Sequence, residues 1–211
     1  MQIFWFDELG STQTYLKEKL RCGELHSPVA VVADKQTEGI GSRGNGWIGL
    51  EGNLFFSFAI ARGDLPSDLA LESSSIYFSY LLKEALAEEN SQVWLKWPND
   101  FYLKEMKIGG TITFLRDNDL VCGIGLNLLK SPQGFAHLDI EIDKKELLNK
   151  FFKKIEKKSS WKQIFSKFEV EFTHSKKHST HFDNNKISLE NADLNDDGSL
   201  NIDGQRIYSL R

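Results

Sequence analysis

Apolar residues along the chain fall into short runs, which are typical of strands, and longer periodic stretches, which are typical of helices. The strand-like runs are residues 3–6, 29–33, 54–61, 93–96, 107–115 and 120–128. The run 29–33 is apolar throughout, which predicts a strand buried on both faces. Only Arg116-Asp-Asn-Asp119 separates the last two runs, so they are predicted to pair as an antiparallel hairpin.

Helical periodicity marks residues 12–21, 67–89 and 143–158, and a further stretch that begins at Ser160. Ser11 has the position of an N-cap for the first helix, and Ser160 with Gln163 fits a capping box for the last. Because helical crossovers and hairpins are mixed along the chain, the sequence predicts an α+β fold. Its expected form is a mixed β-sheet with helices packed on one face.

Beyond residue 186 the pattern changes to short strands at 187–189, 200–202 and 206–210, with turns between them. This change predicts two domains, a main domain of residues 1–182 and a small C-terminal β domain of residues 183–211. The stretch 193–198 imitates the first half of a calcium loop. The bidentate Glu that such a loop requires is replaced by Gly204, so calcium is not expected.

Six glycines, at positions 39, 41, 44, 46, 49 and 52, lie within residues 33–53, which predicts a loop that is neither helix nor strand. Such a backbone can present its N–H groups to an anion. Arg43 offers a planar fork of donors for phosphate, and Trp47 offers a face on which a base could stack. A surface loop without a ligand is the alternative.

Two further segments combine small and polar residues beside strand-like runs. Lys96-Trp-Pro-Asn-Asp100 follows the run at 93, and Lys107-Ile-Gly-Gly110 opens the run at 107. A third, Gly123-Ile-Gly-Leu-Asn127, places glycines inside a predicted strand, where they usually mark a bulge or the close approach of a ligand.

Taken together, these segments resemble the biotin protein ligase family in order and spacing. The matching blocks are Gln36 with Gly39–Trp47, Gly52–Leu54, Lys96–Asp100, Lys107–Gly110 and Gly123–Asn127. The resemblance implies that family's catalytic domain, which is similar to class II aminoacyl-tRNA synthetases. It also implies an SH3-like C-terminal β domain, which is short here.

The activity implied by the resemblance is that of an ATP-dependent biotin–[biotin carboxyl-carrier protein] ligase. Such an enzyme converts biotin and ATP to biotinoyl-5'-AMP and then transfers biotin to one lysine of an acceptor. The expected acceptor is the biotin carboxyl carrier protein of acetyl-CoA carboxylase. ATP and biotin are the expected substrates, with Mg²⁺ shielding the departing pyrophosphate.

The same resemblance assigns site residues. The catalytic candidates are Lys107, Arg43, Lys96 and Asp100. The residues expected to bind biotin are Ser11, Thr12, Gln36, Gly39, Gly41, Lys107, Gly123 and Gly125. The residues expected to bind the nucleotide are Arg43, Trp47, Asn53, Lys96, Asn99 and Asn127. No side chain is assigned to a metal.

The glycine-rich segment departs from the family pattern at three positions. Ile40, Ser42 and Asn45 stand where the family commonly has arginine. Because these arginines would add positive charge beside the phosphates, we expect weaker nucleotide binding or a leakier adenylate intermediate.

Composition limits the remaining possibilities. The net charge of −4 argues against a dedicated nucleic-acid binder, and the chain begins at the catalytic region, so no DNA binding is expected. Without a signal peptide or an apolar run long enough for a membrane span, a cytoplasmic protein is expected. Cys22 and Cys122 are interpreted as small buried side chains rather than as a disulfide. A homodimer is possible.

Three alternatives remain open. The nearest is a lipoate or octanoate ligase or transferase of related fold with an analogous lysine. A second is a non-catalytic biotin-binding regulator. The third is a catalytically dead acceptor-binding protein, against which the retained Lys107 argues. Separately, His174, His178 and His181 invite a zinc interpretation, but no acid or cysteine adjoins them and the segment is rich in lysine, so a metal is not expected.

Overall fold

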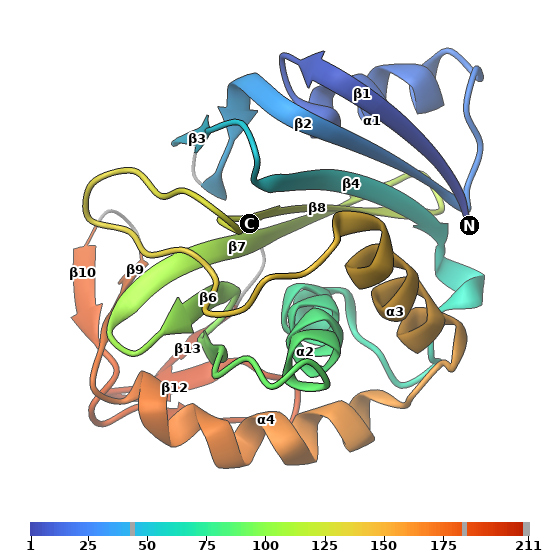
Figure 1. Cartoon of the computed structure of the whole chain (residues 1–211). Helices are drawn as coiled ribbons and strands as arrows, with labels where there is room; N and C mark the ends of the chain where they lie inside the picture. The colour runs from blue at the N-terminus through green and yellow to red at the C-terminus, as the bar shows by residue number, and fades with distance from the viewer. Residues whose placement is uncertain (43–44, 183–184, 209–211) are drawn as a thin grey trace.

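The computed structural model describes residues 1–42, 45–182 and 185–208 (Figure 1). Its centre is an eight-stranded sheet with the order β1-β2-β4-β8-β7-β6-β5, and β3 pairs with β2. The strands are β1 (Gln2–Leu9), β2 (Val29–Ile40), β3 (Gly46–Gly49), β4 (Leu54–Ala61), β5 (Trp94–Lys96), β6 (Asp100–Leu103), β7 (Met106–Arg116) and β8 (Asp119–Leu126). The pair β1/β2 is parallel and the predicted hairpin β7/β8 is antiparallel, so the predicted mixed sheet is confirmed.

Helix α1 (Thr12–Arg21) makes the crossover between the two parallel strands. The Ser11 hydroxyl accepts a hydrogen bond from Thr14 N at 3.4 Å, as predicted for the N-cap. Leu16, which is fully buried, packs with Val29 and Val31 of β2. The helix therefore covers part of one face of the sheet and places its N-terminus beside β2.

Helices α2 (Ser74–Ala87), α3 (Lys144–Glu156) and α4 (Trp161–Ser175) lie on the other side of the sheet (Figure 1). Helices therefore pack on both faces of the sheet and not on one face as predicted, because α1 buries its apolar side on the opposite face. Phe58 of β4 meets Phe78 of α2 edge to face, with ring centroids 5.0 Å apart. Phe56 meets Phe151 of α3 in the same way at 5.6 Å. Each such contact contributes about 0.5–1.5 kcal/mol beyond the burial of the rings. The predicted capping box of Ser160 and Gln163 at the start of α4 is confirmed.

Three predictions of secondary structure were wrong. The glycine-rich segment is not a continuous loop, because β2 runs to Ile40 and pairs with β3. A Cβ on Gly39 would lie 2.5 Å from Trp47 O, so glycine permits this close pairing rather than breaking the strand. The helix expected from residue 67 begins at Ser74, whose hydroxyl donates to Leu71 O at 2.6 Å and favours a 3-10 turn at Leu71–Ser73. The segment after Lys96 contains β6, which was not predicted.

The C-terminal region contains the predicted small β-sheets. Their strands are β9 (Ser179–Phe182), β10 (Asn185–Ser188), β11 (Asp193–Leu194), β12 (Leu200–Ile202) and β13 (Gln205–Ile207). Leu189, Leu200 and Ile202 belong to the same apolar core as the sheet and helices. The predicted domain boundary falls between paired strands, since Phe182 pairs with Asn185, and the division into two domains stays a prediction.

The two cysteines are free. Cys22 is exposed at the end of α1, so its predicted burial was wrong, because the helix ends there and the side chain lies beyond the packed face. Cys122 is fully buried in β8, and burial raises the pKa of its thiol well above the ordinary value. Across the described ranges, no helix is long and apolar enough to cross a membrane.

Candidate active site

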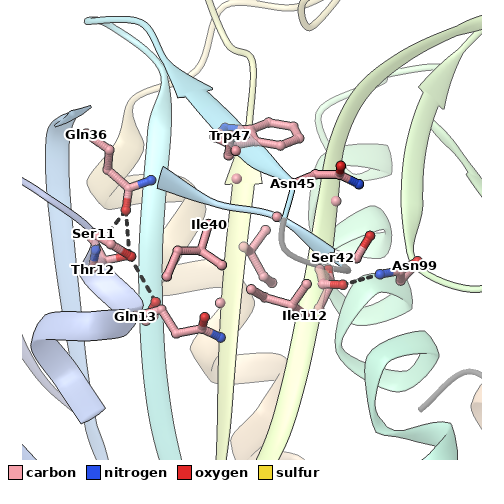
Figure 2. Close-up of a pocket in the computed structure, with 18 of the residues that line it drawn as sticks. Ser11, Thr12, Gln13, Gln36, Ile40, Ser42, Asn45, Trp47, Asn99 and Ile112 are labelled. Atoms are coloured by element: carbon pink, nitrogen blue, oxygen red, sulfur yellow. Dashed lines mark hydrogen bonds between the residues drawn. The ribbon is translucent and has the colours of Figure 1, made fainter. Parts of the chain in front are cut away.

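A cavity of about 280 Å³ opens beside the N-terminus of α1 (Figure 2). Its wall comes from α1, the β2/β3 hairpin, β4, β7, β8 and the segment that follows Lys96. Four of the five sequence blocks contribute residues to the cavity wall, and the block Gly52–Leu54 does not.

One side of the cavity carries a chain of neutral polar groups. Gln36 Oε1 accepts hydrogen bonds from Thr12 N at 2.8 Å and from Thr12 Oγ1 at 3.0 Å. Thr12 Oγ1 lies 2.9 Å from Ser57 Oγ. Because two donors hold the Gln36 oxygen, the orientation of its amide is fixed, and its nitrogen faces the cavity (Figure 2). This side is suited to a neutral ligand that offers both donors and acceptors.

The opposite side carries charge. Asp100 Oδ1 lies 2.6 Å from Lys107 Nζ, and Asp100 Oδ2 lies 3.6 Å from Lys96 Nζ. Two ammonium groups against one carboxylate leave this cluster with a net positive charge, which favours an anionic ligand. Lys107 and Asp100 line the cavity and are partly exposed, whereas Lys96 is buried behind them.

Trp47 forms an aromatic wall between these sides. Its ring meets Phe135 edge to face at 6.3 Å, and Lys107 Nζ lies 5.8 Å from its centroid. Trp47 Nε1 and Asn99 Oδ1 are buried without a hydrogen-bond partner among the described residues. Because unpaired buried polar atoms are costly, a ligand that supplies one acceptor and one donor here would be stabilised.

The structure brings most of the predicted site residues to this cavity. Those on its wall are Ser11, Thr12, Gln36, Gly41, Trp47, Asn99, Asp100, Lys107, Gly123 and Gly125. Those that do not line it are Gly39, Asn53, Lys96 and Asn127. Arg43 lies outside the described residues.

Asn53 and Asn127 form a buried hydrogen-bond network and do not line the cavity. Asn53 is fully buried, and its Oδ1 accepts hydrogen bonds from the backbone N–H groups of residues 128, 129 and 130 at 3.0–3.2 Å. Its Nδ2 donates to Asn127 Oδ1 at 3.3 Å, and Asn127 Nδ2 donates to Ala136 O at 3.1 Å. These contacts shape the loop that carries Phe135. A direct contact of either asparagine with a nucleotide stays a prediction.

Several wall residues were not predicted. They are Gln13, Ile40, Ser42, Asn45, Gly46, Ser57, Gly110, Thr111, Ile112, Ile124 and Phe135. Ser57 carried a signal, because it is a polar residue within an otherwise apolar run. Phe135 carried none, since its position depends on the fold of the loop before α3.

The histidine-rich segment shows aromatic packing. Trp94 has ring contacts with His174 at 5.6 Å and with His178 at 5.3 Å. Burial lowers the pKa of His178 despite Glu105 at 3.3 Å. In the part of the chain with described coordinates, no three His, Cys, Asp or Glu side chains are grouped to hold a metal ion.

Comparison with known proteins relates the chain to one family by both sequence and structure. The biotin/lipoate A/B protein ligase family matches residues 5–128. The structure superimposes with a TM-score of 0.94 on biotin acetyl coenzyme A carboxylase synthetase from Helicobacter pylori with bound biotinylated ATP. The two chains are 43% identical, and the match covers 98% of this chain and 99% of that chain. Biotin protein ligase from Aquifex aeolicus in complex with biotin and ATP is 27% identical, with a TM-score of 0.79 and coverage of 100% and 96%.

A sequence match of 29% identity extends over 63% of this chain and relates it to the bifunctional ligase/repressor BirA of Bacillus subtilis. The match covers 42% of that relative, so the chain spans less than half of its length.

Proposed function

Because the chain belongs to the biotin/lipoate A/B protein ligase family, we propose that it is an ATP-dependent biotin protein ligase. It joins biotin to AMP as biotinoyl-5'-AMP and then transfers the biotinyl group to a lysine of a biotin carboxyl carrier protein. The observation that carries this proposal is the cavity itself, in which the neutral Gln36–Thr12–Ser57 chain faces the Lys107–Asp100 ion pair.

The neutral side is the biotin side. The ureido ring of biotin carries two N–H donors and one carbonyl acceptor, and the Ser11, Thr12 and Gln36 groups can match both kinds. Gly41, Gly123 and Gly125 add no side chain to the wall and leave space for the ring and valeryl chain. This arrangement directs the biotin carboxylate toward Lys107.

In the first step, a carboxylate oxygen of biotin attacks the α-phosphorus of ATP, and the bond to pyrophosphate breaks. The biotin carboxylate, the α-phosphate and the departing pyrophosphate are all negatively charged, so cations must offset their repulsion. Among the described wall residues the cation is Lys107, and Asp100 at 2.6 Å holds its ammonium in place. Lys96 adds a second positive charge behind Asp100, and Arg43 is the third candidate.

Mg²⁺ enters as part of the nucleotide substrate and shields the phosphates. Asp100 is the carboxylate among the described wall residues, and one carboxylate with phosphates and water is an ordinary magnesium environment. Trp47 packs against the adenylate, and Asn99 orients it or the incoming amine. Gly39, Asn53 and Asn127 support these contacts by shaping the β2/β3 hairpin and the loop after β8.

In the second step, the acceptor's lysine amine attacks the carbonyl carbon of the mixed anhydride, an amide bond forms and AMP leaves. The chain needs no nucleophile of its own, because the attacking amine belongs to the partner. The acceptor is the carrier domain of acetyl-CoA carboxylase. The catalytic domain comprises residues 1–182. The protein acts in the cytoplasm as a monomer or a homodimer, and it does not bind DNA.

The test is transfer of biotin to a purified carrier domain. The protein, MgATP and the domain are incubated with biotin, lipoate or octanoate, and the mass of the domain is measured. We expect a biotinyl adduct only. A lipoyl or octanoyl adduct instead would assign the chain to the sister enzymes, and no adduct with any acid would contradict the proposal.

A further inference from the structure

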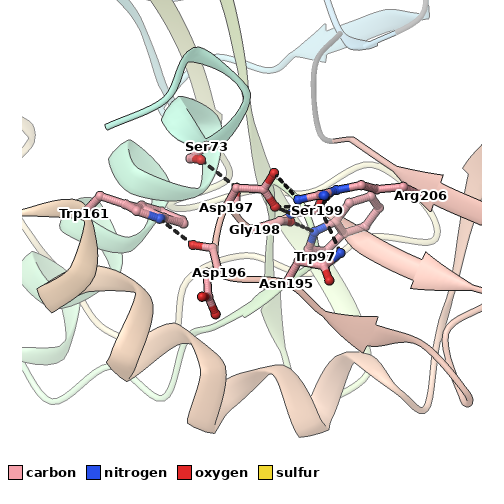
Figure 3. Close-up of polar contacts among 9 residues, drawn as sticks. All are labelled: Ser73, Trp97, Trp161, Asn195, Asp196, Asp197, Gly198, Ser199 and Arg206. Carbon is pink, nitrogen blue, oxygen red and sulfur yellow. Dashed lines mark hydrogen bonds and ion pairs between the residues drawn. The ribbon is translucent and has the colours of Figure 1, made fainter. Parts of the chain in front are cut away.

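A turn near the C-terminus reaches the segment Lys96–Asp100 through its backbone (Figure 3). This turn, residues 195–199, is called here the Gly198 turn. The indole of Trp97 is fully buried, and its Nε1 donates to Gly198 O at 2.8 Å. The backbone carbonyl of Gly198 thus holds the side chain of Trp97, which lies three residues before Asp100 in the sequence.

Three successive carbonyls of the Gly198 turn accept hydrogen bonds from three different elements. Asp196 O accepts from Trp161 Nε1 of α4 at 2.7 Å, and Asp197 O accepts from Ser73 Oγ before α2 at 2.6 Å. Gly198 O accepts from Trp97. The turn therefore joins two helices to the segment that carries Asp100.

Side chains of the turn and of β13 hold its shape. Asp197 Oδ2 accepts from Arg206 Nη2 at 2.7 Å, and Asp197 Oδ1 accepts from Ser199 N at 3.0 Å. Ser199 Oγ donates to Asp197 Oδ1 at 2.5 Å and accepts from Arg206 Nε at 2.9 Å. The planar guanidinium thus closes a ring of charge-assisted hydrogen bonds.

The position of Gly198 leaves little freedom. Its φ is +78°, and a Cβ there would lie 2.7 Å from Ile76 Cδ1. A residue with a side chain would be strained by its backbone conformation and would also push against α2. The carbonyl that binds Trp97 is therefore held at a defined point.

The segment Lys96–Asp100 depends on such support, because β5 is an edge strand of the sheet. Its free edge is bound by side chains of α4: Leu95 N donates to Glu171 Oε1 at 2.6 Å, and Trp97 N donates to Ser175 Oγ at 2.9 Å. Groups outside the sheet thus replace a neighbouring strand and set where the segment lies.

We propose that Trp97 and Arg206 are positioning residues for the adenylation reaction. Arg206 shapes the Gly198 turn, the turn holds the Trp97 indole, and Trp97 sets the place of Asp100 and its partner Lys107. This inference rests on the proposed function. The biotin side of the cavity stands on α1, β2 and β4, which make none of these contacts, so biotin affinity is independent of the turn.

The test measures biotin-dependent ATP–pyrophosphate exchange and biotin affinity on the same variants of the full chain. Trp97→Phe removes the donor to Gly198 O, and Arg206→Gln opens the ring by changing a half-exposed side chain. We expect each to lower kcat for exchange about tenfold, below the ~100-fold that a 1 Å misplacement can cause. Biotin Kd, measured by calorimetry, stays within about twofold of the unaltered protein.

Two controls separate positioning from general stability. Arg206→Lys keeps the positive charge and should recover part of the lost kcat. Lys158→Gln removes an ion pair with Asp64 that has no contact with the Gly198 turn, and it should leave both quantities unchanged.

The outcomes are distinct. Normal exchange in Arg206→Gln and Trp97→Phe, or a biotin affinity that falls as much as kcat, would overturn the positioning role while leaving the proposed function intact. No exchange by the unaltered protein would overturn the proposed function and the positioning role with it.

Discussion

Gly125 faces the indole of Trp47 so closely that a Cβ built on Gly125 would lie 2.8 Å from Trp47 Cε2 and Nε1. The strand β8 thus leaves room for the aromatic wall of the cavity by omitting a side chain. Glycine inside a strand commonly marks such a close approach.

Gly125→Ala should therefore displace the Trp47 ring and raise the KM for ATP about tenfold, the effect of losing about 1.4 kcal/mol of binding. The unfolding midpoint should not fall, because alanine is the better residue within a strand. Steady-state kinetics and thermal unfolding check both statements. Gly63→Ala is the control, since nothing lies within 4 Å of a Cβ at Gly63 and this residue does not line the cavity. Equal KM values for the two variants would argue against Trp47 as a wall of the nucleotide site.

Asn53 is predicted to act on stability first. Asn53→Ala removes the acceptor of three backbone N–H groups in a fully buried place. Unsatisfied buried donors are costly, so the free energy of unfolding in urea should fall by roughly 2–4 kcal/mol. Asn149→Ala, on the exposed face of α3, is the control. If the free energy of unfolding fell by less than about 0.5 kcal/mol, the hydrogen-bond network of Asn53 would not be important for stability.

The predicted loss of arginines near the phosphates can be tested at Ser42, which lines the cavity. Ser42→Arg adds a guanidinium to that wall and should lower the KM for ATP about tenfold, as expected for one charge-assisted hydrogen bond. Ser42→Gln controls for side-chain length without charge. Equal ATP affinity in the arginine variant and the unaltered protein would refute the weak-binding hypothesis.

Asp197 gives a pH-dependent prediction. Burial raises the pKa of Asp197, but hydrogen bonds from Ser199 and the charge of Arg206 outweigh it and lower the pKa below the ordinary value. A depressed folded-state pKa adds stability above the unfolded pKa, and this stability is lost as the pH falls through the folded value.

The stability difference between the unaltered protein and Asp197→Asn should accordingly be largest near neutral pH and shrink toward about pH 3. Thermal unfolding across that range measures it, with Asp203→Asn in the neighbouring exposed turn as the control. If the stability difference grew as the pH falls, the pKa of Asp197 would be raised in the folded protein and not lowered.

Local patterns predicted much of the fold. The hairpin β7/β8 and the caps at Ser11 and Ser160 depend on residues close in sequence and were confirmed, and each predicted run of the main sheet contains a strand, although several bounds differ. The glycines at 39 and 49 misled the prediction, because their role is a close backbone approach between β2 and β3 that is set by pairing. Strand β6 was missed since its four residues follow a proline turn directly.

The candidate site shows the same limit. The resemblance to the biotin protein ligase family assigned Gln36, Trp47 and Lys107 to the site, and the structure places all three on one cavity. Asn53 and Asn127 could not be separated from the wall residues, because their partners are backbone groups of a loop with no regular pattern. The link from Arg206 to Trp97 spans most of the C-terminal half and has no sequence signal.

The central claim is that this cavity activates the carboxylate of biotin at Lys107. Biotin-dependent ATP–pyrophosphate exchange, measured for the unaltered protein, Lys107→Ala and the exposed-lysine control Lys186→Ala, tests it most directly. We expect exchange by the unaltered protein and the control, and a fall of kcat by about 100-fold or more in Lys107→Ala, as for the loss of one charge-stabilising group. Undiminished exchange in Lys107→Ala, or none with biotin in the unaltered protein, would contradict the account.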